Sequence, residues 1–370
     1  MILKKGIADM RVLLAGGGTA GHVNPALAIA GEIKKNNPDA QFLFIGTKKG
    51  LESTLVPKAG YDIEYVEVAG FKRSLSPKNA LVALKAAGGV AKAVHIIRKF
   101  KPDIAIGTGG YVSGPAMYAA HLCKVPVMIH EQNVFPGATN RMANNFAAVT
   151  AISFEDSRRY FKNTENIILT GNPIKMELFS AAPVKNEKTS VLIMGGSLGA
   201  EAINNGAVAL ILANKDKYNI TLSTGKGDYD RITALLQKEG FDLASQSSVN
   251  VVPYIYDTPK AYAEADLVIA RSGAITVSEL AALGKPSILV PSPNVTHNHQ
   301  EYNAKALADQ GGAIMIKESQ LTDEKLISTA NDLAGNPEKL AAMSVVASKT
   351  GICDAAKTLC KIAEETALKR

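Results

Sequence analysis

One pattern recurs four times along this 370-residue chain and constrains its fold more than any other feature: a short apolar run, a glycine-rich turn and a helical segment. The runs are residues 12–15, 103–106, 191–194 and 267–270, and the turns are 16–22, 107–115, 195–200 and 271–276. Uninterrupted apolar runs are typical of strands buried on both faces of a parallel sheet, and their alternation with helices predicts βαβ units. The chain is therefore predicted to be an α/β protein.

Further short apolar runs complete two similar halves. We predict additional strands at 42–45, 65–68, 125–129 and 149–152 in the first half, and at 220–223, 249–252, 287–290 and 313–316 in the second. Pro173, Pro183 and a polar run at 185–188 interrupt the pattern between the halves. These observations predict two doubly wound, Rossmann-like domains, residues 1–173 and 174–354, that face each other across one cleft.

The first glycine-rich turn resembles part of a dinucleotide-binding motif. Gly16, Gly18 and Gly21 match the spacing of the dinucleotide fingerprint, which also requires an acidic residue about 20 positions later. Residues 46–49, after the second expected strand, contain no acid, which disfavours NAD(P), and no Walker A motif is present. For any one of the four glycine-rich turns, the alternative to anion binding is a tight turn that binds no ligand. Four copies in two matched halves favour anion binding by at least two of them, as a diphosphate-containing donor would need.

The turn at 271–276 gives the most specific expectation. It begins a helix, and the backbone N–H groups at a helix start can hold a pyrophosphate through their unpaired donors and the helix dipole. Glu279 lies a few residues further on, where its carboxylate could accept hydrogen bonds from two ribose hydroxyls. The alternative is that Glu279 only compensates the helix dipole.

Six segments together resemble motifs of the MurG family, the bacterial UDP-GlcNAc transferases that convert lipid I to lipid II in peptidoglycan synthesis. They are residues 16–22 (GGGTAGH), 109–115 (GGYVSGP), 130–133 (HEQN), 171–173 (GNP), 195–197 (GGS) and 271–279 (RSGAITVSE). The resemblance covers essentially the whole chain. It implies an inverting glycosyltransferase of the B type that needs no cofactor and no bound metal, with a last helix near 355–370 that packs back on the first domain.

The resemblance also implies which residues bind the donor. In the second half, Ser197 would bind phosphate, Ile255 would meet the uracil through its backbone, and Glu279 would bind the ribose. Gln300 would bind the GlcNAc hydroxyls. The pyrophosphate and sugar would be lined by the helix start, with Ala274, Ile275, Thr276, Val277 and Ser278.

From the first half, the resemblance implies that Asn133 and the turn of Thr19, Ala20 and Gly21 close onto the sugar. Three positions depart from the family pattern: Ala20 stands where many members carry Gly, Leu198 where Gln or Arg is frequent, and Lys175 where Arg is usual. Lys175 keeps the positive charge but loses the bidentate fork of arginine, so its substrate contact is the least secure of the set.

Inverting transfer needs a base for the acceptor hydroxyl, and His22 is the leading candidate because it ends the first glycine-rich turn. Free imidazole titrates near neutral pH, with a pKa of about 6.5. The alternative is that His22 only makes a hydrogen bond that organises the turn. Glu131, beside His130 at a strand end, is a weaker candidate whose alternative role is to shape the loop presenting Asn133. Backbone N–H groups would stabilise the departing UDP.

The remaining candidate metal ligands favour no metal site. Asp228 and Asp230 match the spacing of a DxD motif, but their place before a helical stretch suits an acidic helix N-terminus better. His297 and His299 have no further ligand cluster beside them. Three cysteines without CxxC spacing indicate neither a disulfide framework nor zinc, and favour a reducing cytosol.

The net charge of +7 has a local origin. Residues 72–101 contain eight Lys or Arg and no acid, interleaved with apolar residues. The alternatives are a solvated helix face and an interfacial patch in which apolar side chains enter the headgroups while lysines meet anionic lipids. Nucleic acid is disfavoured, because no binding motif is recognisable. The expected patch comprises Phe71, Lys72, Arg73, Leu75, Lys78, Leu81 and Lys85.

The expected activity is transfer of GlcNAc from UDP-GlcNAc to the C4 hydroxyl of MurNAc in undecaprenyl-pyrophosphoryl-MurNAc-pentapeptide, lipid I. No signal peptide or membrane span is predicted. The lipid acceptor that the resemblance implies predicts a peripheral location at the cytoplasmic face of the bacterial membrane. The alternatives are a related transferase with another lipid acceptor and an isomerase resembling UDP-GlcNAc 2-epimerase. A two-lobed solute-binding protein would ordinarily carry an export signal.

Overall fold

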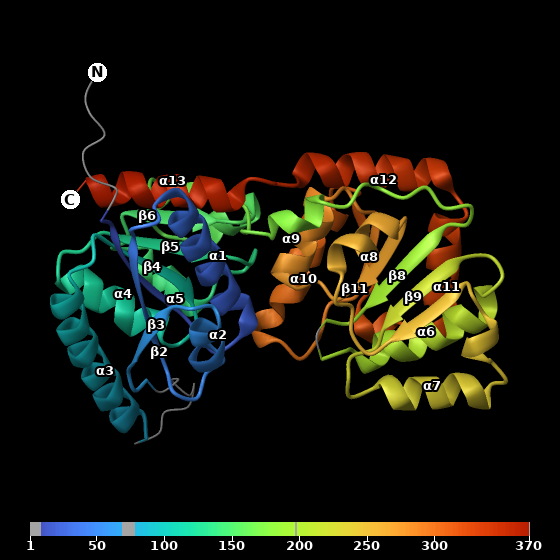
Figure 1. Ribbon diagram of the computed structural model, residues 1–370, viewed down its shortest axis with the longest axis horizontal. Helices are drawn as coiled ribbons and strands as arrows, with labels where there is room; N and C mark the ends of the chain where they lie inside the picture. Colours follow the sequence, from blue (N-terminus) through green and yellow to red (C-terminus); the bar gives the residue numbers. More distant parts are fainter. Residues whose placement is uncertain (1–8, 69–77, 197, 370) are drawn as a thin grey trace. The chain divides into compact units, whose positions relative to one another are not determined.

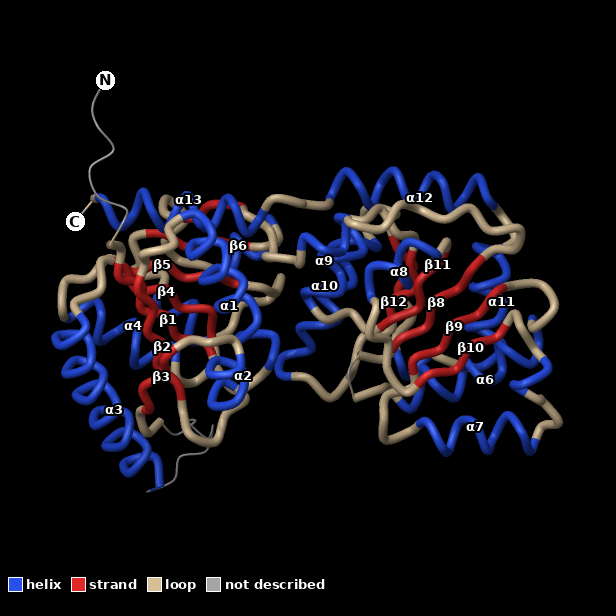
Figure 2. Tube along the Cα trace, in the orientation of Figure 1, coloured by secondary structure: helices blue, strands red, loops and turns tan. Residues whose placement is uncertain are grey.

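The computed structural model describes residues 9–68, 78–196 and 198–369, with side chains omitted for 78–86. Two compact units divide the chain: Met1–Ile174 with Asp354–Arg370, and Lys175–Cys353. They are called unit 1 and unit 2 below. Each unit contains one parallel sheet, drawn in red in Figure 2.

Unit 1 is built on a seven-stranded sheet with the order β3-β2-β1-β4-β5-β6-β7. Neighbouring strands pair in parallel throughout; for example, Leu13 of β1 lies opposite Leu43 of β2 and Ala105 of β4. The strands are β1 (Arg11–Gly16), β2 (Gln41–Gly46), β3 (Asp62–Tyr65), β4 (Ile104–Gly109), β5 (Val127–Glu131), β6 (Val149–Ile152) and β7 (Ile167–Leu169).

Helices cover both faces of this sheet because alternate side chains of each buried strand point to opposite faces. Val12 and Leu14 join one core with α1 and α13, whereas Leu13 and Ala15 join a second core with α3 and α4. The helices are α1 (Ala20–Asn36), α2 (Glu52–Lys58), α3 (Lys78–Phe100), α4 (Ser113–Leu122), α5 (Ala138–Ala143) and α13 (Ala355–Leu368), with a 3₁₀ helix η1 (Glu155–Tyr160).

The last helix of the chain belongs to unit 1. α13 lies against α1 (Figure 1), and its Leu359 and Ala363 are fully buried in the core that α1 shares with the sheet. Asn37 Nδ2, just after α1, donates a hydrogen bond of 2.6 Å to Glu364 Oε1. Residues from the two ends of the sequence therefore form one core.

Unit 2 repeats the strand order of the first six strands of unit 1. Its sheet runs β10-β9-β8-β11-β12-β13, so β8 takes the place of β1 and β11 the place of β4. The strands are β8 (Ser190–Met194), β9 (Asn219–Ser223), β10 (Val249–Val252), β11 (Leu267–Ala270), β12 (Ser287–Leu289) and β13 (Ala313–Met315). The duplication of architecture expected from the sequence is therefore present in the sheets.

The helices of unit 2 also lie on both faces of its sheet (Figure 1). Val191 and Ile193 of β8 share a core with α6 and α11. The helices are α6 (Glu201–Asn214), α7 (Tyr229–Lys238), α8 (Thr258–Glu264), α9 (Ala274–Ala282), α10 (His299–Ala308), α11 (Asp323–Ala334) and α12 (Pro337–Thr350). The 3₁₀ helices are η2 (Met176–Phe179), η3 (Leu243–Ser245), η4 (Thr296–Asn298) and η5 (Glu318–Gln320).

The strand order places the glycine-rich turns. In each sheet the order reverses at the central pair, β1–β4 in unit 1 and β8–β11 in unit 2, and ligands of doubly wound folds bind outside the carboxyl ends of such a pair. All four glycine-rich turns follow these four strands. The recurring pattern in the sequence therefore identifies the two sheet edges, one in each unit, where ligands bind in folds of this type.

Several boundaries differ from the prediction. The strand expected at 65–68 is β3, Asp62–Tyr65, an edge strand whose half-exposed, alternating side chains do not form a continuous apolar run. The three-residue edge strand β7 was not predicted. The helix expected from 25 to 35 begins at Ala20, directly after the glycine-rich turn. Within the described residues, no helix is both long and apolar enough to span a membrane.

Candidate active site

The two glycine-rich turns of unit 1 touch each other. Gly17 N donates a hydrogen bond of 3.2 Å to Gly109 O, at the end of β4. A Cβ on Gly110 would lie 2.2 Å from Gly17 O, and Gly110 has φ +85°. Only glycine meets both conditions, because another residue would strain the backbone and collide with Gly17. The turns after β1 and β4 are thus joined by a hydrogen bond and by close backbone packing.

His22 lies in the first turn of α1, half-buried beside these turns. Its Nδ1 lies 3.2 Å from Gly17 O and 3.3 Å from Thr19 Oγ1. Thr108 Oγ1, from β4, donates a 2.7 Å hydrogen bond to the carbonyl of His22. The expected residues Thr19, Ala20 and Gly21 are exposed at the start of the same helix. The structure therefore gathers the predicted base and these three residues in one place.

Glu52 belongs to the same turn, and the sequence analysis did not identify it. It begins α2 and is only 1 % exposed. Its carboxylate accepts hydrogen bonds from Gly18 N at 2.9 Å, Thr47 N at 2.9 Å and Thr47 Oγ1 at 2.7 Å. Burial raises the pKa of Glu52, but these hydrogen bonds more than offset it, so the pKa lies below its usual value. The sequence gives no signal for this contact, because Gly18 and Glu52 are 34 positions apart.

Glu131 and His130 are both buried at the end of β5. Glu131 accepts hydrogen bonds from Asn133 N and Nδ2 at 3.0 and 3.2 Å, from Gly137 N at 3.1 Å and from Asn140 Nδ2 at 2.9 Å. Both carboxylate oxygens are therefore engaged within the loop. This geometry matches the alternative role, in which Glu131 shapes the loop that carries Asn133.

His130 is the centre of a buried polar network. Its Nε2 lies 3.1 Å from Gly171 O and 3.3 Å from Ser153 Oγ, and its Nδ1 lies 3.0 Å from Gln132 Nε2. Ser153 Oγ also donates to Asn172 Oδ1 at 2.9 Å. Burial lowers the pKa of His130 to about 4, although the hydrogen bond with Gly171 opposes the shift. His130 is therefore neutral at physiological pH.

In unit 2, the turn after β11 leads into α9 through Gly273, the N-cap residue. Ser272 is fully buried, and its Oγ donates a 2.8 Å hydrogen bond to Gln300 O. Asn303 Nδ2 donates to Ser272 O at 3.3 Å, and Gln300 Oε1 accepts from Ser292 N at 2.9 Å. These bonds tie α10 to the turn. Gln300 is thus held close to the start of α9, where Ala274, Ile275, Thr276, Val277 and Ser278 lie.

Glu279, in the second turn of α9, has a buried partner. The hydroxyl of Tyr262, only 1 % exposed, donates a 3.1 Å hydrogen bond to Glu279 Oε2. Burial raises the pKa of Glu279 above its usual value, while this hydrogen bond and the nearby positive charge of Lys175 oppose the rise. Burial and the charge of Glu279 raise the pKa of Tyr262 well above its usual value. Lys175 itself is exposed.

The turn after β8 packs on the turn after β9. A Cβ on Gly199, which has φ +81°, would lie 2.0 Å from Thr224 O, and one on Gly225 would lie 2.6 Å from Gly199 N. Leu198 is 90 % exposed on this turn, whereas Ser197 lies outside the described residues.

Ile255 is half-buried in the segment after β10. It lies between two exposed tyrosines, Tyr254 and Tyr256, whose rings are 5.0 Å apart.

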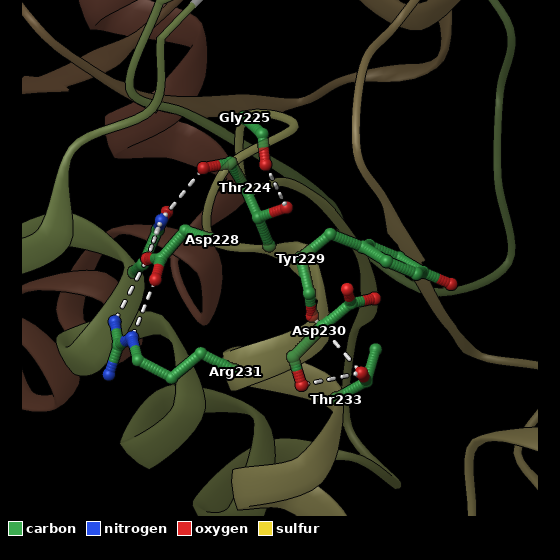
Figure 3. Close-up of polar contacts among 8 residues, drawn as sticks. Thr224, Gly225, Asp228, Tyr229, Asp230, Arg231 and Thr233 are labelled. Atoms are coloured by element: carbon green, nitrogen blue, oxygen red, sulfur yellow. Dashed lines mark hydrogen bonds and ion pairs between the residues drawn. The ribbon is translucent and has the colours of Figure 1, made fainter.

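Figure 3 shows the surroundings of Asp228 and Asp230, the two acids that match the DxD spacing. Asp228 precedes α7 and forms an ion pair with Arg231, at 2.5 Å between Nε and Oδ1, and accepts a 2.6 Å hydrogen bond from Asn204 Nδ2. The side chain of Asp230 points away from that of Asp228. Among the described residues, no three His, Cys, Asp or Glu side chains gather as a metal would require.

The expected membrane patch falls largely outside the described residues. Phe71, Lys72, Arg73 and Leu75 are not described, and Lys78, Leu81 and Lys85 lie in the part of α3 described as backbone only. The later part of α3 shows the expected amphipathic pattern, with Ala93, Ile96 and Ile97 buried and Arg98 and Lys99 exposed.

Comparison with known proteins assigns both units to one class. Residues 12–152 match the glycosyltransferase family 28 N-terminal domain, and residues 190–359 match the glycosyltransferase family 28 C-terminal domain. The chain therefore belongs to glycosyltransferase family 28, and its two parallel-sheet units are those of a B-type glycosyltransferase.

Within this class, two similar relatives share one name. Proteins from Thermoanaerobacter sp. (strain X514) and Bacillus cytotoxicus are 44 % and 42 % identical over 361 and 366 residues. These matches cover 95 % and 96 % of this chain and 99 % of each relative. Both are named UDP-N-acetylglucosamine–N-acetylmuramyl-(pentapeptide) pyrophosphoryl-undecaprenol N-acetylglucosamine transferase.

Solved structures agree with this assignment. MurG from Acinetobacter baumannii matches with a TM-score of 0.80 and 30 % identity, covering 96 % of this chain and 99 % of that one. UDP-GlcNAc 2-epimerase from Neisseria meningitidis matches with a TM-score of 0.66 at 17 % identity, covering 98 % of this chain and 100 % of that one. The second likeness concerns the fold alone.

The burial of His130 predicts acid sensitivity. Between pH 6.5 and 4 the unfolded chain binds a proton at this position and the folded chain does not, so stability falls as pH falls through this window. The loss amounts to about 3 kcal/mol in the free energy of unfolding. Urea titrations of His130→Gln at several pH values should show a shallower decline than the parent protein. The exposed His121→Gln control should follow the parent, and an unchanged slope in His130→Gln would contradict the assignment.

Proposed function

We propose that this chain transfers GlcNAc from UDP-GlcNAc to the C4 hydroxyl of MurNAc in lipid I, with inversion at the anomeric carbon. The observation that carries the proposal is the match to transferases of that name over 95 % or more of this chain. In the reaction, the acceptor oxygen forms a bond to the anomeric carbon as the bond to UDP breaks on the opposite side. The hydroxyl proton passes to a base, and UDP leaves as the anion.

Unit 2 is proposed to bind the donor. Its α9 begins at the turn after β11, where backbone N–H groups and the helix dipole favour a pyrophosphate and stabilise the charge that develops on UDP. The Tyr262 hydroxyl donates a hydrogen bond to Glu279 Oε2, and the carboxylate held in this way would bind the ribose diol. Gln300, which is tied to this turn through Ser272, would bind the sugar hydroxyls. Ile255 would meet the uracil, and Lys175 and Ser197 the phosphates.

Unit 1 is proposed to bind the acceptor and to supply the base, His22. Its ring lies at the joined turns after β1 and β4, where a doubly wound sheet binds its ligands. Both oxygens of Glu131 are engaged with the loop that holds Asn133, so Glu131 is better suited to shaping this loop. Asn133 and the exposed residues Thr19, Ala20 and Gly21 would contact the transferred sugar.

The direct test supplies labelled UDP-GlcNAc and a lipid I analogue to the purified protein. Label should move to the lipid, and UDP should appear in equal amount. Formation of an epimer without any acceptor would instead support the isomerase. Transfer only to diacylglycerol would support a different lipid acceptor. Either of these two results would overturn the proposal.

The role assigned to Glu279 predicts a donor-binding defect. Glu279→Gln removes the charge that strengthens two hydrogen bonds to the ribose diol, so UDP-GlcNAc should bind at least about tenfold more weakly. Isothermal titration calorimetry measures this directly. Glu264→Gln, which removes a partly exposed carboxylate from α8 in the same unit, is the matched control. The assignment fails if Glu279→Gln binds UDP-GlcNAc as tightly as the control does.

The lipid acceptor suggests that the basic segment meets an anionic membrane at its cytoplasmic face. The double substitution Phe71→Ser and Leu75→Ser should reduce binding to anionic liposomes, because each serine removes apolar surface that would enter the headgroup region. Binding of UDP-GlcNAc should stay intact. Sedimentation with liposomes measures the first and calorimetry the second. Unchanged liposome binding would refute the patch.

A further inference from the structure

One peptide group connects Glu52 to His22. The N–H of Gly18 donates to Glu52 Oε2 at 2.9 Å, and the carbonyl of Gly17, in the same peptide group, lies 3.2 Å from His22 Nδ1. In a trans peptide the N–H and C=O point in opposite directions, so this one group can hold a carboxylate on one side and an imidazole on the other. The result is a continuous chain of hydrogen bonds from the buried carboxylate to the ring.

The series of hydrogen bonds from Glu52 to His22 favours one position for the proton on the imidazole ring. A carbonyl oxygen only accepts hydrogen bonds, so a hydrogen bond between His22 Nδ1 and Gly17 O, 3.2 Å apart, places the proton on Nδ1. Thr19 Oγ1, 3.3 Å from the same nitrogen, can accept from this proton but can also donate to an unprotonated Nδ1, so the Gly17 carbonyl is the contact that selects the Nδ1-protonated ring. The neutral ring then has its lone pair on Nε2, the nitrogen that would take a proton from an acceptor hydroxyl. Thr108, bonded to the backbone carbonyl of His22, holds the same residue from β4.

The carboxylate is fixed independently of the histidine. Thr47 N and Oγ1 hold Glu52 Oε1 at 2.9 and 2.7 Å. A Cβ on Gly17 would lie 2.7 Å from the carboxyl carbon of Glu52, one on Gly46 would lie 2.7 Å from its Cγ, and one on Gly50 would lie 2.1 Å from its Oε2. Three glycines from two turns therefore make the room that this one carboxylate occupies.

An ionised acceptor strengthens the whole chain of hydrogen bonds. Hydrogen bonds to a carboxylate are shorter and stronger than those to neutral groups, and linked bonds polarise one another at low dielectric. The charge on Glu52 therefore makes Gly17 O a better acceptor for the proton on His22 Nδ1. The arrangement resembles the carboxylate–histidine pair of hydrolases with one peptide group inserted.

We propose that Glu52 is a positioning residue for His22, acting through the Gly17–Gly18 peptide to fix the ring and its tautomer. The proposal rests on the proposed function, in which His22 is the base. Glu52 does not touch substrate in this role.

Glu52→Gln tests the proposal with little change of volume. The carboxamide cannot accept from both Gly18 N–H and Thr47 N–H, because one of its two positions is an NH₂ donor. We expect kcat to fall by about tenfold or more, because replacing the carboxylate behind a catalytic histidine by its amide causes large losses of kcat in hydrolases. KM for UDP-GlcNAc should not change. Glu64→Gln, an exposed acid on β3, is the control and should keep the parental kcat.

A double-substitution cycle separates positioning from simple structural damage. If Glu52 acts through His22, Glu52→Gln should cost nothing further in a His22→Ala background. An equal loss in both backgrounds would overturn the proposal. If Glu52→Gln does not fold, Thr47→Val removes one hydrogen bond to the carboxylate and should give a smaller loss of kcat. That loss should again vanish in His22→Ala, and its persistence there would overturn the proposal.

Nitrogen NMR of the full chain with labelled histidine gives a readout besides activity. In the parent protein His22 should be protonated on Nδ1, and in Glu52→Gln this tautomer should lose population to the Nε2-protonated form. An unchanged tautomer would overturn the proposal. If His22→Ala retains the parental rate, the assignment of the base fails, and the tautomer measurement alone then decides whether Glu52 controls the ring.

Discussion

Parallel pairing of one central pair of strands in each sheet is the constraint on which the rest of the structure depends. β1 pairs with β4 and β8 with β11, and from each pair the strand order runs outward in opposite directions. Turns that follow such a pair must diverge, so their backbones remain available at the carboxyl edge of the sheet. The four glycine-rich turns and the proposed base, His22, follow these four strands.

The sequence analysis identified most strands because parallel strands buried on both faces are continuous apolar runs. It missed β7 and misplaced β3, since both are short edge strands that are exposed on one side and lack this signal. His22 and Glu279 could be proposed as site residues because each lies close to a glycine-rich turn in the sequence. Glu52 could not, because its role depends on Gly18, which is 34 positions away and approaches it only in the folded sheet.

The first glycine-rich turn shows why a sequence fingerprint alone does not define a ligand. Gly16, the first glycine of the fingerprint, is needed because a Cβ there would lie 2.0 Å from Thr108 Oγ1 and 2.8 Å from His22 O, which are atoms of the protein itself. Two acids then illustrate opposite environments. N–H and O–H donors around Glu52 outweigh its burial and lower its pKa, whereas the burial of Glu279 outweighs its partners and raises its pKa.

The place of α13 has a consequence for how the protein is made. Leu359, Cys360 and Ala363 are part of the core of unit 1, yet they are synthesised after all of unit 2. Domains generally fold as units during synthesis, beginning at the N-terminus. Here the first unit to emerge lacks part of its core until α13 has been synthesised. Its apolar face on α1 stays uncovered for the whole time that unit 2 is being made, so unit 2 can complete its core first.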